Sequence, residues 1–175
     1  MPSDDQRDRT DPRPGRHAPA VPAPTLPTIR VGGFIVREGR VLLVRQHRGA
    51  DPSAPDYWLL PGGGLEFGET LAEALIREAA EELGVDVLPS RPIALIESIS
   101  PEPDYPKHVV HVVLAARLSE NTAGPLAPHD QDVLEARFFS AHELQGLRLR
   151  PPFASDLRRF LEALPDGVEY LGRMW

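Results

Sequence analysis

The chain has 175 residues, of which 41% are hydrophobic and 26% charged, and its formal net charge is −7. These values exclude a wholly disordered chain and a coiled-coil rod, and the length suits one compact domain. The negative charge argues against a protein that binds nucleic acid through its phosphate backbone, because such binding needs a basic surface. Since the sequence contains no cysteine, it also excludes a disulfide framework, a thiolate metal site and a cysteine nucleophile.

The first 27 residues differ in composition from the rest of the chain. They hold seven of the 20 prolines, together with four Asp, four Arg and hardly any large apolar residue. Such a segment cannot offset its ordering entropy by burial, so we predict a disordered tail, favoured as a spacer over a partner-docking segment. The sequence shows no secretory signal and no run of the roughly 18 to 20 apolar residues that a membrane helix needs, so it predicts a cytoplasmic protein without membrane contact.

From residue 28 onwards, strand-like and helical patterns interleave over a domain that we place at residues 28–165, with a C-terminal extension at 166–175. A polar turn with a glycine joins the first two strands into a hairpin. Strands are predicted at residues 29–36, 41–45, 58–60, 92–98, 107–117 and 134–139, and helices at 71–83, 140–144 and 152–164. Because the elements show no regular βαβ alternation, the predicted fold class is α/β, with a mixed sheet and helices on both faces.

The predicted helix at residues 71–83 has clear signals at both ends. Thr70 and Glu73 have the spacing of a capping box, and Gly84 follows the last apolar position. Three consecutive glycines, Gly62–Gly64, and Gly68 precede the helix, so the backbone there can approach a ligand closely. A glycine loop that leads into a helix with acidic residues is suited to hold a metal and a phosphate together.

Three carboxylates lie on one side of this helix. At about 100° per residue, Glu78, Glu81 and Glu82 fall within one arc, beside the apolar positions that would face the core. Like charges at this spacing oppose helix formation unless solvent or cations offset their repulsion. Oxygen ligands without sulfur favour magnesium, manganese or calcium over zinc or copper.

Residues 63–85 read GGLEFGETLAEALIREAAEELGV and resemble the 23-residue Nudix box, G-x5-E-x7-R-E-U-x-E-E-x-G-U, where U is a bulky aliphatic residue. Ala79 departs from the pattern, since it is smaller than the usual aliphatic residue. A chance match to the seven fixed positions is on the order of 10⁻⁹ per window. An ordinary charged surface helix is therefore the weaker interpretation. The matching positions are Gly63, Glu69, Arg77, Glu78, Glu81, Glu82, Gly84 and Val85.

This resemblance implies a Nudix-type α/β/α sandwich around a mixed β-sheet. It also implies Mg²⁺- or Mn²⁺-dependent hydrolysis of a nucleoside diphosphate linked to another moiety. By the match to the motif, Glu78 and Glu82 correspond to the principal metal ligands, Glu81 to a further or water-mediated ligand, and the Gly62 carbonyl to a backbone ligand. Members of the family are often dimers, so a homodimer is a further expectation, although no surface in the sequence specifies it.

Two more residues of the box, Arg77 and Glu69, resemble the structural partners that hold the helix and the glycine loop together. The reaction also needs a base that takes a proton from the attacking water, either a box glutamate or an acidic residue on a later loop. Asp130 and Asp132 lie in a predicted loop, whereas Glu135 begins a strand and is favoured as a structural partner of Arg137. The later candidates are Glu120, Asp130, Asp132 and Glu135.

The substrate is less closely specified than the reaction. Pro101, the sixteenth residue after Val85, resembles a downstream proline of the family's ADP-ribose pyrophosphatases, although a loop proline is an equally simple interpretation. Arg45 and His47 flank a loop beside the box and could bind phosphate or a base, or simply be solvated charges. Trp58 is a candidate pocket wall or core residue.

We therefore expect a pyrophosphohydrolase whose partner is a small-molecule nucleotide, with ADP-ribose-like substrates slightly ahead of nucleoside triphosphates. The competing hypothesis is a catalytically idle Nudix module that senses a nucleotide or binds a protein. The complete acidic cluster argues against it, because a sensor could dispense with some of these carboxylates.

Overall fold

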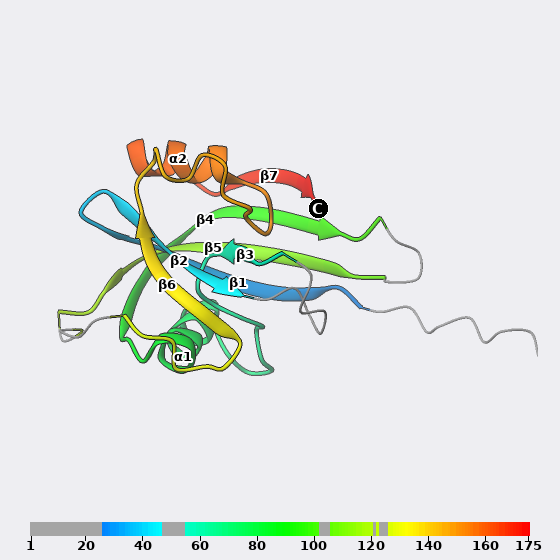
Figure 1. The fold of residues 1–175 in the computed structure, drawn as a ribbon. Helices are drawn as coiled ribbons and strands as arrows, with labels where there is room; N and C mark the ends of the chain where they lie inside the picture. Colours follow the sequence, from blue (N-terminus) through cyan, green and yellow to red (C-terminus); the bar gives the residue numbers. More distant parts are fainter. Residues whose placement is uncertain (1–25, 47–54, 102–105, 121, 123–125) are drawn as a thin grey trace, which may run out of the picture.

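The computed structural model describes residues 26–46, 55–101, 106–120, 122 and 126–175, so nearly all of the predicted tail lies outside the described residues. Figure 1 shows a curved sheet with α1 on one face and α2 on the other. The described elements are, in chain order, β1 (Thr28–Arg37), β2 (Arg40–Gln46), β3 (Tyr57–Leu59), α1 (Leu71–Leu83), β4 (Val87–Ile99), β5 (His108–Leu118), β6 (Val133–Phe139), α2 (Ala154–Glu162) and β7 (Glu169–Met174).

The sheet is mixed, as the sequence predicts. Its strands follow the order β3-β2-β1-β5-β4-β7, and β6 pairs with β2 outside this path. The β1–β5 and β4–β7 pairs are parallel, and the other pairs are antiparallel. This arrangement confirms the predicted α/β class, with one helix packed on each face.

Two parts of the sequence-based assignment need correction. The predicted helix at residues 140–144 is wrong: residues 141–146 form successive turns that end at Gly146, whose φ of 80° breaks the helical path. The predicted strand start at residue 92 is too late, since β4 begins at Val87. The β4–β5 register shifts around Pro89 and Pro92, and these prolines hide the first part of the strand in the sequence.

The segment predicted as a C-terminal extension contributes a strand to the sheet. Within residues 166–175, β7 pairs in parallel with β4. The guanidinium of Arg159 on α2 donates to both carboxylate oxygens of Glu169 at 2.9 and 2.6 Å, which fixes the start of β7. Strand β7 lacks a regular apolar alternation, so its sequence gives little sign of a strand.

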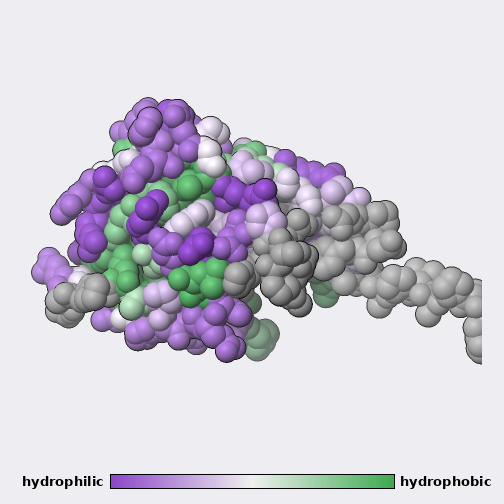
Figure 2. All heavy atoms as spheres, viewed as in Figure 1, coloured by the Kyte–Doolittle hydropathy of each residue, from purple (hydrophilic) through white to green (hydrophobic). Residues whose placement is uncertain are grey.

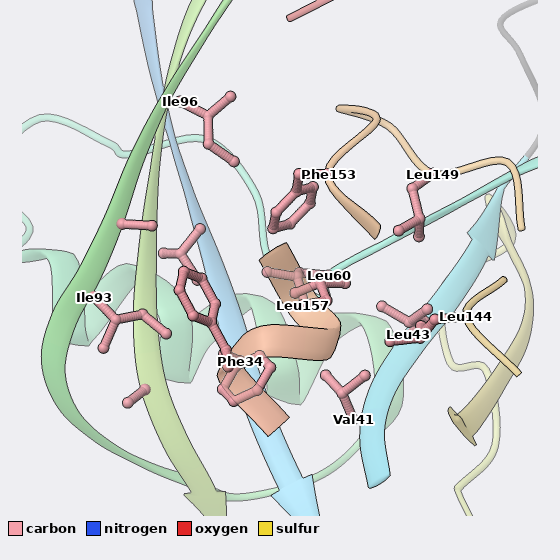
Figure 3. Close-up of a cluster of buried hydrophobic side chains, with 14 of the residues drawn as sticks. Phe34, Val41, Leu43, Leu60, Ile93, Ile96, Leu144, Leu149, Phe153 and Leu157 are labelled. Atoms are coloured by element: carbon pink, nitrogen blue, oxygen red, sulfur yellow. The ribbon is translucent and has the colours of Figure 1, made fainter. Parts of the chain in front are cut away.

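Apolar side chains on the two faces of the sheet form two core clusters. Alternation along β1 directs Val31 and Ile35 into the cluster under α1 and Phe34 into the cluster under α2. Helix α2 adds Leu157 and Phe160, and the rings of Phe34 and Phe160 meet edge-on with centroids 6.0 Å apart. Figure 3 shows the α2 cluster between the sheet and the segments around α2.

The outer surface of the two helices is polar. In Figure 2, hydrophilic residues cover the α1 and α2 ends of the face shown, and hydrophobic residues are visible between them. Over the described ranges, no helix has the length and apolar character needed to cross a membrane.

One polar pair is enclosed in the sheet on the α2 face. The ring nitrogen Nε2 of His111 on β5 lies 3.0 Å from the hydroxyl of Ser98 on β4. Burial, followed by the positive charges of Arg30, Lys107 and Arg150, lowers the pKa of His111 from 6.5 to about 4. The imidazole is therefore neutral in the folded protein at neutral pH.

This shift predicts a pH-dependent stability. Below pH 6.5 the unfolded chain binds a proton at His111 that the folded chain does not bind, so the free energy of unfolding should fall as the pH drops from 6.5 to about 4. The variant His111→Gln should flatten this decline in urea unfolding measured across that range. The exposed His142→Gln serves as the control. An unchanged slope in the His111 variant would show that other groups cause the decline.

Candidate active site

Helix α1 carries the acidic residues of the candidate site, and local hydrogen bonds fix both of its ends. The Thr70 hydroxyl accepts from the backbone N–H of Glu73 at 3.2 Å, and the Thr70 N–H donates to the Glu73 carboxylate at 2.8 Å. The helix ends at Gly84, which has the left-handed φ of 63° that glycine adopts without strain. The predicted capping box and helix bounds are confirmed.

The carboxylate of Glu82 is buried at the contact between α1 and the glycine loop. One oxygen accepts from the Gly62 backbone N–H at 3.0 Å, and the other accepts from the Gln46 side-chain amide at 3.2 Å. Burial raises the pKa of Glu82 to about 7, and the negative charges of Glu78 and Asp130 add to the effect, while the Gly62 N–H opposes it. Since both charges act on Glu82, these three carboxyl groups lie near one another.

Glu78 lies directly against the backbone of the loop. A Cβ atom added to Gly63 would come within 2.0 Å of a Glu78 carboxylate oxygen, so any side chain at this position would displace the carboxylate. Hydrogen bonds from the Val31 N–H to the Gly63 carbonyl (2.8 Å) and from the Gly33 N–H to the Pro61 carbonyl (2.9 Å) tie the loop to β1. The sheet therefore positions the loop against the helix.

Arg77 connects the loop to the acidic face of α1. Its guanidinium donates to both carboxylate oxygens of Glu69 at 2.7 and 3.1 Å and to the Gly64 carbonyl at 3.0 Å. The same group donates to Glu78 at 2.9 Å and to Glu81 at 3.1 Å. These contacts raise the pKa of Arg77, and they fit the structural role that the sequence assigns to Arg77 and Glu69.

The donor chemistry of this cluster fits a hard divalent cation. Glu78, Glu81 and Glu82 offer only oxygen. The pKa of Glu82, which is raised first by burial and then by the charges of Glu78 and Asp130, reflects a cost of ionisation that a cation would relieve. In this structure, Glu78 and Glu81 both accept hydrogen bonds from the Arg77 guanidinium. Across the described ranges, no three His, Asp or Glu side chains lie closely enough together to hold a metal ion. A cation would thus compete with the Arg77 guanidinium for these oxygens.

The Gly62 carbonyl, predicted as a backbone ligand, accepts a hydrogen bond from the guanidinium of Arg30 on β1. A positive charge therefore already lies at this carbonyl. Arg30 was not among the predicted site residues. Neither was Gln46, the donor to Glu82. Both occupy strands outside the box in sequence, and alternation along β1 could have indicated only that Arg30 lies on the same face of the sheet as Phe34.

The loop before β6 brings one later acidic residue to the box. The His129 N–H donates to the Glu82 carbonyl at 2.8 Å, which ties this loop to the end of α1. Asp130 follows directly, and its charge reaches Glu82. The Asp132 N–H donates to an Asp130 carboxylate oxygen at 2.7 Å, while Asp132 itself is exposed. Glu120, the other loop candidate, is also exposed.

Of the predicted substrate-binding residues, Arg45 and Trp58 are opposite one another on β2 and β3, with the Arg45 guanidinium 5.9 Å from the centroid of the Trp58 ring. Arg45 pairs with Asp56 at 3.0 Å and with Glu135 at 3.1 Å, so its charge is neutralised. Glu135 is thus a structural partner, but of Arg45 and not of the predicted Arg137. The Trp58 ring packs edge-on against Phe139 with centroids 4.6 Å apart, which places it beside the core.

The last two predicted substrate residues are Pro101 and His47. Pro101 is exposed immediately after β4, where the Ser100 N–H donates to the Lys107 carbonyl at 2.8 Å. His47 lies outside the described residues.

The NUDIX domain family model matches residues 26–164, most of the chain, so the protein belongs to this family and to its class of enzyme, the Nudix hydrolases. It is 31% identical to the phosphatase NudJ of Escherichia coli K12 over 131 residues, which covers 74% of this chain and 80% of NudJ. It is 32% identical to an ADP-ribose pyrophosphatase of Methanocaldococcus jannaschii over 121 residues, 69% of this chain and 66% of that protein. The match to YjhB of Bacillus subtilis, at 34% identity, spans 54% of this chain and only 43% of YjhB.

Solved structures show the same fold. An ADP-ribose pyrophosphatase from Streptococcus suis superimposes with a TM-score of 0.61 at 25% identity, covering 83% of this chain and 99% of that one. A MutT NUDIX hydrolase from Burkholderia pseudomallei gives 0.62 at 26% identity, covering 81% and 100%. The predicted Nudix-type fold is confirmed by these neighbours.

The contact between Gly63 and Glu78 can be tested with two adjacent glycines. Gly63→Ala should displace the Glu78 carboxylate and lower turnover by about 100-fold or more, since a shift of about 1 Å in a catalytic group can have this effect. Gly64→Ala is the matched control, because a Cβ atom there meets nothing within 4 Å. Turnover is measured on the best substrate, and thermal unfolding verifies the fold. Equal activity in both variants would contradict the proposed contact.

Proposed function

We propose that the protein is a metal-dependent pyrophosphohydrolase that cleaves a nucleoside diphosphate linked to another moiety. The observation that carries this proposal is the packing of Glu78 and Glu82 against the backbone of Gly62 and Gly63, because it joins two carboxylates to a glycine loop. Membership of the NUDIX family supports the same reaction.

In this proposal, Glu78 and Glu82 would hold Mg²⁺ or Mn²⁺ and Glu81 would contribute a further or water-mediated contact. The Gly62 carbonyl would add a backbone oxygen in exchange for its hydrogen bond from Arg30. A bound divalent cation neutralises phosphoryl oxygens and makes a water molecule more acidic. The chain itself supplies Arg77, which holds the helix and the loop in register through Glu69.

Asp130 is the proposed general base of the reaction. It follows the residue that anchors its loop to α1, and its charge reaches the buried Glu82. A carboxylate at this position can accept the proton of an attacking water. Asp130, Asp132 and Glu120 are all exposed, but of the three only the charge of Asp130 acts on Glu82, and Glu135 is paired with Arg45, so the other three are weaker candidates.

ADP-ribose-like compounds are the first substrates to test, ahead of nucleoside triphosphates. The support is that the M. jannaschii and S. suis relatives are ADP-ribose pyrophosphatases by name, together with the position of Pro101. A cytoplasmic location and a homodimer stay predictions from the sequence and from the family resemblance.

The metal assignment predicts the behaviour of conservative variants. Glu78→Gln and Glu82→Gln should each reduce Mg²⁺- or Mn²⁺-dependent release of AMP from ADP-ribose by at least about 100-fold, because they remove the charge that holds the cation. Glu66→Gln, an exposed glutamate of the same motif, should keep wild-type turnover. Thermal unfolding and calorimetric titration of Mn²⁺ accompany the assay.

Wild-type turnover in the Glu82 variant would contradict the metal assignment. Saturable nucleotide binding by the wild type without phosphate release, in either metal and across ADP-ribose, nucleotide sugars and nucleoside triphosphates, would instead favour the idle sensor.

The assignment of Asp130 can be separated from metal binding. Asp130→Asn should lower kcat by about 100-fold or more, within the usual range for loss of a general base, and should leave KM and Mn²⁺ affinity nearly unchanged. Asp132→Asn is the matched control on the same loop. A kcat that falls equally in both variants would point to the loop structure and not to a base.

A further inference from the structure

A small cavity, open to solvent, lies on the α2 face of the sheet. Much of its wall is apolar and comes from β4, β5 and the segments after β3 and before α2. Figure 3 labels three of these side chains, Ile96, Phe153 and Leu60. The polar side chains of its lining are Arg30, His111 and Arg150.

The cavity adjoins the candidate active site through Arg30. The Arg30 guanidinium lines the cavity and also donates to the Gly62 carbonyl of the glycine loop. Leu59 and Leu60 line the cavity, and the chain reaches Gly62 only two residues after Leu60. Arg30 is therefore a common neighbour of the glycine loop and the cavity.

Arg150 enters the cavity from the segment before α2. Its backbone N–H donates to the Trp58 carbonyl at 2.9 Å, which anchors this segment to β3. Its guanidinium lies 5.4 Å from the ring centroid of Tyr57 and 5.1 Å from that of Trp175. Contacts with the rings use the flat faces of a guanidinium, and its N–H donors at the edge stay available for a ligand.

The side chains that line the cavity carry more positive than negative charge, although the charge of Arg30 also acts on the buried carboxyl group of Glu82. In the part of the chain that the structure describes, neither Arg30 nor Arg150 has a carboxylate within salt-bridge distance, although Arg45, Arg77 and Arg159 all do. Both charges act on His111, which is neutral and bonded to Ser98. In a chain of net charge −7, two guanidiniums at one cavity without such partners favour an anionic ligand.

We propose that this cavity binds an anionic end group, a phosphate or a carboxylate, on the moiety that the pyrophosphate joins to the nucleoside. The inference rests on the proposed function, since it concerns the substrate of the same site. Guanidiniums only donate hydrogen bonds, so they select a group that only accepts them. The enzyme should then prefer substrates whose distal half is negatively charged over substrates whose distal half is a neutral sugar.

Two pairs of compounds differ mainly in the anionic end group. UDP-glucuronate carries a carboxylate that UDP-glucose lacks, and ATP carries a terminal phosphate that ADP lacks. For the wild-type chain, calorimetric binding in EDTA and KM in Mg²⁺ should both favour the charged member of at least one pair. Arg150→Gln should reduce that preference by about 10-fold or more, as expected for lost hydrogen bonds to a charged group, and should leave the uncharged or shorter member within about 2-fold.

Arg148→Gln is the matched control, because Arg148 is an exposed arginine two residues away that does not line the cavity. It should keep the full preference. Arg150→Lys retains the charge and should retain a part of the preference, and it replaces the glutamine variant if that variant unfolds. A preference confined to one pair identifies phosphate or carboxylate as the bound group.

Equal binding of both members of each pair by the wild type would overturn the proposal, and so would an equal loss for both members in Arg150→Gln. Absence of binding by every compound would also overturn it. A preference in binding without any hydrolysis would contradict the proposed function and leave the cavity assignment standing. Hydrolysis without a preference would support the proposed function and contradict the cavity assignment.

Discussion

The close approach of the glycine loop to the acidic face of α1 is the contact on which the candidate site depends. The Gly62 N–H meets the Glu82 carboxylate, and Gly63 leaves no room for a side chain beside Glu78. Neither the loop nor the helix could hold this contact alone, because the loop is hydrogen-bonded to β1 and α1 packs on the same sheet. The two core clusters therefore set the geometry of the site as well as the stability of the fold.

Such an acidic cluster is costly to assemble, because burial and mutual repulsion both oppose the ionised form. The chain offsets part of this cost with arginines. Arg77 bridges three glutamates, and Arg30 lies at the Gly62 carbonyl. These two side chains hold the box together from two sides, although neither is a predicted metal ligand. The arginines neutralise only part of the negative charge, and a hard divalent cation would neutralise more of it.

The two faces of the sheet carry different functional groups of the proposed enzyme. The α1 face carries the acidic groups, and the α2 face carries a cavity with two arginines that lack carboxylate partners among the described residues. Arg30 belongs to both, since β1 runs through the middle of the sheet and its guanidinium reaches the glycine loop. A substrate with a charged distal group would be held from both sides of this strand.

The sequence by itself determined the family, the mixed sheet, the bounds of α1 and the acidic residues of the box, because these depend on local spacing: the capping pair at Thr70 and the helical positions of the glutamates. It missed β7, whose pattern is irregular, and wrongly predicted a short helix at residues 140–144. Only the tertiary structure brought Arg30 to Gly62 and the Asp130 loop to Glu82, and it paired Arg45 with Glu135. Such contacts join residues distant in the chain, and the hydrogen-bonded register of the strands decides which of them meet.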